Sequence, residues 1–89
     1  FEATLKLSPG MSVAYYNMGV VFIAMQDYTS ALSAFNKAIE NNNDFGEAYY
    51  NRGYVSFTLG NRPAGSADLS RAGQLGAAPS YNLLKRMAN

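Results

Sequence analysis

A repeat with a period of 34 residues runs through most of the chain. Residues 14–19 read AYYNMG, and they return 34 positions later as AYYNRG at 48–53. Ala38 likewise returns as Ala72. A period of this size indicates one supersecondary unit that has been copied, with each copy burying its apolar face against the next. The repeat therefore favours a binding or scaffolding surface over a catalytic pocket.

Each unit reads as two helices, because its apolar residues recur at helical spacing in two stretches. In the first unit we expect one helix from a cap at Ser12 to a break at residues 26–27, and a second from Tyr28 to the amide-rich segment at 41–44. The stripe expected to be buried between these helices comprises Tyr15, Met18, Gly19 and Phe22, with Ala14 and Met25 at the same spacing. The facing stripe comprises Tyr28, Ala31, Leu32, Phe35, Ala38 and Ile39.

The second unit copies this plan, with helices expected at about 46–59 and 62–75 around a turn at Gly60-Asn61. Pro63 suits the first turn of the later helix. We expect one domain over 1–89, divided into the end of a partial repeat (1–11), two repeats (12–45 and 46–79) and a capping helix (80–89), which also reads as a truncated third repeat. Because Phe1 falls in what reads as mid-helix, we expect a mature segment or an excised domain.

These residues resemble the tetratricopeptide repeat, whose signature sets aromatic, large apolar and small residues at fixed spacing. The first unit matches it with Tyr15, Met18, Gly19, Phe22, Ala31 and Phe35, and has Asn43 in place of the final Pro. The second unit is looser, with Tyr49, Arg52, Gly53, Ser56, Gly65 and Leu69, and Ala77 in place of Pro. The resemblance implies an all-α fold, namely a right-handed α–α superhelix of antiparallel helix pairs with a C-terminal capping helix.

In arrays that resemble this one, the first helix of each unit lines a concave groove in which extended peptides lie. The groove residues implied here are Val13, Tyr16, Asn17, Val20, Ile23 and Ala24, followed by Glu47, Tyr50, Asn51, Tyr54, Phe57 and Thr58. The helical period supports this assignment, because these residues lie off the stripe that must be buried between helices. We expect a non-catalytic module that binds a protein or peptide segment in this groove, although neighbouring units or the capping helix could cover some of its apolar residues.

One subfamily binds the C-terminal carboxylates of chaperone tails through basic and amide residues. Asn51 stands where such a groove has an amide, but Tyr16 and Val20 occupy the places of a Lys and a second Asn. We therefore do not expect an acidic tail as the ligand.

Two further expectations concern contacts outside the groove. Arg52 and Asp68 replace Met18 and Ala34 of the first unit, so we expect an ion pair across the second hairpin; the alternative is two solvated charges. The alternative function is a structural element that self-associates through the Phe1 end or continues a longer array.

The composition argues against several other classes of protein. The chain has no His and no Cys, so the commonest general base and the commonest metal ligands are missing. We expect no enzyme activity, no cofactor and no metal. Seven basic and six acidic residues are spread along 89 positions, with no basic stripe for nucleic acid and no apolar run long enough to span a membrane. Nothing in the sequence indicates a cellular compartment.

Overall fold

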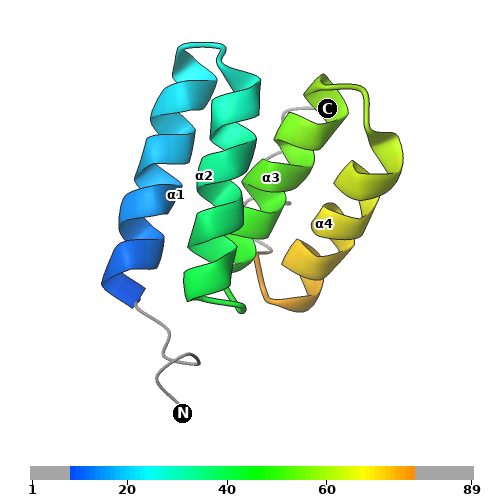
Figure 1. The fold of residues 1–89 in the computed structure, drawn as a ribbon. Coiled ribbons are helices and arrows are strands. Elements are labelled where there is room, and N and C mark those ends of the chain that lie inside the picture. The colour runs from blue at the N-terminus through cyan, green and yellow to red at the C-terminus, as the bar shows by residue number, and fades with distance from the viewer. Residues whose placement is uncertain (1–8, 78–89) are drawn as a thin grey trace, which may run out of the picture.

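A computed structural model describes residues 9–77, which form four helices and no strand (Figure 1). The helices are α1 (Pro9–Ala24), α2 (Tyr28–Asn41), α3 (Gly46–Thr58) and α4 (Arg62–Gln74). They make two helical hairpins, α1–α2 and α3–α4, joined by the contact between α2 and α3. The fold is an all-α helical repeat, as the sequence predicted. The helices expected at 1–7 and 80–89 lie outside the described residues.

The short connections between helices are set by polar caps and by residues with positive φ. Asp27 accepts a hydrogen bond from Ser30 N (3.3 Å) at the start of α2, and Asn61 accepts one from Ala64 N (3.3 Å) at the start of α4. Gln26 and Gly60 adopt positive φ (62° and 90°) in the two hairpin turns. Each turn thus satisfies the first free backbone donors of the helix that follows.

The first helix begins earlier than expected. It starts at Pro9 rather than after a cap at Ser12, so Ser12 lies inside α1 and is buried. Proline fits this position because its missing N–H has no helical acceptor in the first turn. Residues 9–11 therefore belong to α1.

The core lies between the hairpins and is centred on α2. Its buried residues are Ala31, Phe35, Ala38, Ile39, Ala48 and Val55. In the first hairpin, close packing depends on Gly19, where an added Cβ would lie 2.6 Å from Cε1 of Phe35. The Phe35 ring therefore packs directly against the backbone of α1 at Gly19.

In the second hairpin the two glycines meet directly. A Cβ on Gly53 would lie 3.0 Å from the carbonyl oxygen of Gly65, so α3 and α4 approach backbone to backbone. This close approach leaves little room for any side chain at either position.

Helix α1 forms one edge of the described structure and α4 the other (Figure 1). The expectation that Met18 is buried between helices was wrong: it is 46% exposed. Met25 is 64% exposed, and Ala14 is exposed as well. The reason is geometric, because Met18 lies at the rim of the contact between α1 and α2, where it lines an open hollow beside Ala34 and Lys37 and is only partly covered.

Candidate partner-binding face

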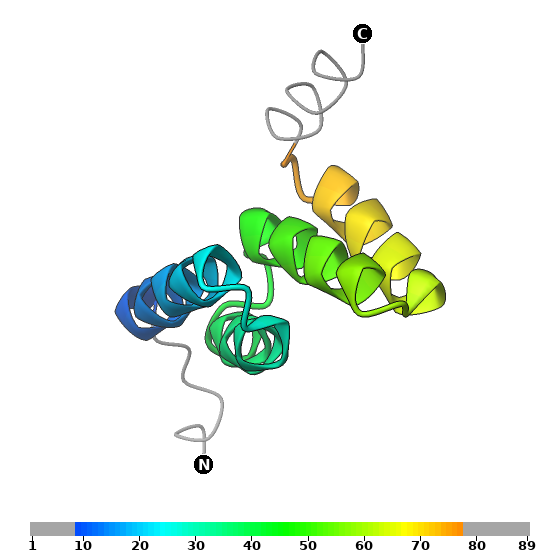
Figure 2. The same ribbon diagram turned by 90° about the horizontal axis from the view of Figure 1, so that it is seen from above.

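Helices α1 and α3, the first helices of the two hairpins, come into direct contact (Figure 2). Four large apolar side chains that the sequence assigned to a groove are exposed on them: Val13 (49%), Val20 (41%), Tyr54 (47%) and Phe57 (38%). Asn17, Ala24, Glu47 and Thr58 are exposed too. We call the surface formed by these eight residues, together with Tyr16, Ile23, Tyr50 and Asn51, the α1–α3 face.

A hydrogen bond joins the two helices of this face. Asn51 Nδ2 on α3 donates to the Tyr16 hydroxyl on α1 at 2.9 Å. The Tyr16 ring packs edge-on against Phe35, with centroids 5.7 Å apart, and against Phe45 at 4.9 Å. Tyr16 thereby fixes α1 relative to α3 through both its ring and its hydroxyl.

The pKa of Tyr16 is raised above its ordinary value. Burial is the main cause, because the phenolate would lose hydration, and the nearby charge of Glu47 adds to the rise. The hydrogen bond from Asn51 opposes both effects by stabilising the phenolate. The hydroxyl therefore stays neutral at physiological pH, where its oxygen accepts the bond from Asn51.

Three of the predicted groove residues are more internal than expected. Tyr16 and Ile23 are half-buried and pack against the core, and Asn51 is engaged with Tyr16. The amide nitrogen of Asn51, which the sequence placed in the groove, already donates to Tyr16 within the protein. Asn17 remains exposed.

Phe57 is shared between the α1–α3 face and the α3–α4 contact. A Cβ on Gly65 would lie 2.7 Å from Cδ2 of Phe57, so the ring covers the backbone of α4. The expectation that Phe57 faces only the groove, and not the contact between helices, was wrong on this point. Its equivalent one repeat earlier, Ile23, is half-buried and packs against the core.

The α1–α3 face carries a single charge. Glu47 is its only acidic or basic residue, and it is exposed on the first turn of α3. Within residues 9–77 it forms no ion pair. A carboxylate near a helix N-terminus is favourable in itself, because it complements the helix dipole.

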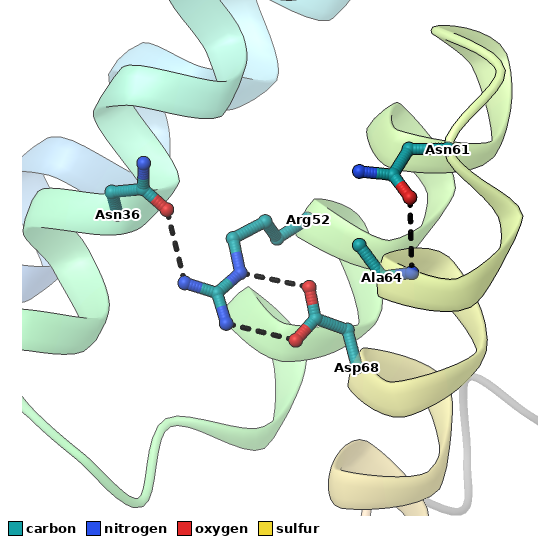
Figure 3. A network of polar contacts seen from close by, with 5 residues as sticks. All are labelled: Asn36, Arg52, Asn61, Ala64 and Asp68. Carbon is teal, nitrogen blue, oxygen red and sulfur yellow. Dashed lines mark hydrogen bonds and ion pairs between the residues drawn. The ribbon is translucent and has the colours of Figure 1, made fainter.

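Away from this face, Arg52 links three helices (Figure 3). Its Nε and Nη2 donate to the two carboxylate oxygens of Asp68 on α4, each at 2.8 Å, and its Nη1 donates to Asn36 Oδ1 on α2 at 2.9 Å. The guanidinium carbon also lies 5.4 Å from the centroid of the Tyr49 ring. The expected ion pair is thus present and bidentate. It raises the pKa of Arg52, which burial alone would lower.

Sequence reasoning missed two of these contacts. The Tyr16–Asn51 hydrogen bond joins residues 35 positions apart, one repeat plus one residue, and the period could have indicated that they are neighbours. The hydrogen bond from Arg52 to Asn36 had a weaker signal in the sequence, because Asn36 becomes relevant only once Arg52 is known to reach α2.

Residues 9–77 contain neither a metal-binding cluster nor a membrane-spanning helix. No three His, Cys, Asp or Glu side chains gather there as a metal ion would require. None of the four helices has the length and apolar run needed to cross a bilayer.

The fold defines the class of protein as a helical-hairpin repeat with an open face on its first helices. Residues 12–45 match the family model of the tetratricopeptide repeat, so the chain carries a tetratricopeptide repeat. Such repeats generally mediate protein–protein interaction and are typically non-catalytic. No curated protein and no solved structure matches the chain.

Proposed function

We propose that the chain is a non-catalytic module whose α1–α3 face binds a segment of a partner protein. The observation that carries the proposal is the exposure of Val13, Val20, Tyr54 and Phe57 on two helices in direct contact. Exposed apolar groups that cluster in this way usually mark an interaction site. The Tyr16–Asn51 hydrogen bond supports the proposal as well, because it holds the two helices of the face in a fixed relation before a partner arrives.

Tyr54 is the strongest candidate for an anchor. It is half-exposed, and its aromatic ring can bury a large area with few rotamers to immobilise while its hydroxyl remains available for a hydrogen bond. Since Glu47 is the only charge on the face, binding should depend weakly on salt. The lack of any Lys or Arg there also disfavours an acidic tail as the partner.

Affinity measurements on one peptide can test the role of Tyr54. A display library of random 12-residue peptides would be selected on the immobilised chain, and the strongest binder would be titrated by calorimetry. Tyr54→Ala should weaken binding about 10- to 100-fold, which corresponds to about 1–3 kcal/mol for an anchor. Folding should remain nearly intact, because Tyr54 is not among the buried core residues.

The matched control is Met11→Ala, which shortens a 48% exposed side chain two and a half helical turns before Val20 and therefore on the opposite side of α1. It should leave the affinity for the peptide unchanged. Equal losses for both variants, or no loss for Tyr54→Ala, would count against the α1–α3 face as the binding site.

A further inference from the structure

A polar hollow is bordered by α2, α3 and α4, on a surface separate from the α1–α3 face. Its polar lining comprises Asn36 on α2, Arg52 and Ser56 on α3, Asn61 at the cap of α4, and Asp68 on α4. Figure 3 shows Asn36 and Asn61 on either side of the Arg52–Asp68 pair. The hollow has a volume of about 340 Å³, which lies within the range of about 300–1,000 Å³ that is usual for ligand sites. No residue of the α1–α3 face lines it.

A difference between the two repeats accounts for this hollow. Ser56 stands where the first repeat has Phe22, whose ring is half-buried and packs against the core. A small side chain in place of a large one leaves space that the neighbours fill only in part. The Arg52–Asp68 pair, which takes the place of two apolar residues of the first repeat, lines that space with polar groups.

Ser56 presents an unused hydrogen-bonding group to this hollow. The residue is only 5% accessible, and its hydroxyl has no hydrogen-bond partner among residues 9–77. In this part of the chain no side-chain nitrogen or oxygen is both fully buried and unpaired, so the hydroxyl reaches the open space of the hollow. Since an unpaired polar group in such a position is unfavourable, a molecule that enters the hollow and bonds to it gains from the contact.

The other polar side chains of the hollow leave further donors unused. Asn61 Oδ1 accepts a hydrogen bond from Ala64 N, and Asn36 Oδ1 accepts one from the guanidinium. Neither amide nitrogen donates to another residue within 9–77. The Arg52 guanidinium uses three of its N–H groups, which leaves the rest of its five donors free. The Asp68 carboxylate accepts two of those bonds and keeps lone pairs for more.

We propose that this hollow binds the primary carboxamide of a glutamine or asparagine side chain in a partner segment. The charges of Arg52 and Asp68 cancel, so the hollow favours an uncharged group. A carboxamide supplies a carbonyl that accepts from the unused amide and guanidinium donors, and an NH2 group that donates to Asp68 or Ser56. A carboxylate of the same shape would lie near Asp68 without a proton to offer it, and an ammonium group would face Arg52. The proposal does not rest on the function proposed for the α1–α3 face.

Titration with blocked amino acids, followed by heteronuclear NMR of the side-chain amides, tests the proposal. The probes are the N-acetyl, N-methylamide derivatives of glutamine, glutamate and methionine, which share one backbone and have side chains of similar length. The glutamine probe should shift the NH2 signals of Asn36 and Asn61 saturably, with a dissociation constant of about 1 mM for a ligand of its size. The glutamate and methionine probes should bind about 10-fold more weakly, because each leaves hydrogen bonds unmade.

Asn61→Asp removes two amide donors but keeps the helix cap, because Asp27 caps α2 at the equivalent position of the first repeat. It should weaken binding of the glutamine probe about 10-fold, measured on the Asn36 signals. The matched control is Gln74→Glu, which makes the same change from amide to carboxylate on α4 outside the hollow and keeps an acceptor for Arg71. It should leave the affinity unchanged.

Ser56→Phe gives an independent test, because it fills the hollow with the ring that the first repeat has at this position. It should abolish the shifts, and circular dichroism would confirm that the variants stay helical; if this one does not, Asn61→Asp carries the test. Equal affinity for the three probes would assign the hollow to a backbone amide, tighter binding of the glutamate probe would assign it to anions, and either result would overturn the proposal. So would the lack of a saturable shift up to about 50 mM glutamine probe, undiminished binding by Asn61→Asp, or an equal loss in Gln74→Glu.

Discussion

Removing one partner of the Arg52–Asp68 pair should destabilise the second hairpin strongly. The side chains are only 23% and 11% accessible, and two parallel hydrogen bonds of 2.8 Å join them. Asp68→Ala leaves the guanidinium partly buried with Asn36 as its remaining acceptor. Breaking a fully buried pair costs about 3–5 kcal/mol. Because Arg52 is only partly buried, we expect a loss of about 2–3 kcal/mol in the free energy of unfolding.

The first repeat supplies the compensating change. It has Met18 and Ala34 where the second has Arg52 and Asp68. Replacing a buried pair by apolar residues is often close to neutral, so the double variant Arg52→Met/Asp68→Ala should recover most of the loss. Urea unfolding followed by circular dichroism at 222 nm measures all three proteins. For a domain of this size each kcal/mol corresponds to a shift of about 4–8 °C in Tm.

An exposed ion pair provides the control for this experiment. Arg71 and Asp44 lie 3.9 Å apart with 44% and 79% of their side chains accessible, so Asp44→Ala should cost less than about 1 kcal/mol. If Asp68→Ala costs no more than Asp44→Ala, or if the double variant is less stable than Asp68→Ala, the reasoning about burial is refuted.

Two further predictions concern packing and pH. Gly19→Ala should destabilise the protein by about 1–3 kcal/mol, because its Cβ would overlap the Phe35 ring. Gly73→Ala meets open space in α4 and should stabilise the protein by up to about 1 kcal/mol. Thermal unfolding should therefore show a lower Tm for the first variant and a higher Tm for the second. Because the pKa of Tyr16 is raised above 10.0, its contribution to stability is complete below pH 10 and is lost as the pH rises through the folded-state pKa. Urea midpoints at pH 8 and pH 11 should therefore fall less in Tyr16→Phe than in the wild type, and an equal fall would show that ionisation of Tyr16 is not linked to unfolding.

The 34-residue period was sufficient to predict the architecture of residues 9–77. The repeated unit fixes the helix pairs, and the covariation of Met18 with Ala34 and of Arg52 with Asp68 indicated which side chains face each other across a hairpin. The helix start was predicted less well. Pro9-Gly10 looks like a terminator in the sequence, yet proline is equally suited to a first helical turn.

The faces of α1 were harder to predict because the helix is apolar on all sides and uncharged. A helical period separates a buried stripe from an exposed one only when polar residues mark the boundary. Met18 therefore looked like a core residue although it is half-exposed. Tyr16 and Phe57 looked like groove residues, although Tyr16 also packs against the core and Phe57 against α4. Those distinctions depend on which helices are present as neighbours, which the local pattern does not encode.

Chemical-shift mapping tests the proposed partner-binding face most directly. Methyl and aromatic spectra of the chain would be recorded with and without the peptide selected from the display library. We predict that the largest shifts fall on Val13, Val20 and Tyr54, with smaller changes at Met11 on the opposite side of α1. Shifts concentrated on Met11 and Met25 or on α4, with Val20 and Tyr54 unchanged, would contradict the assignment of partner binding to the α1–α3 face.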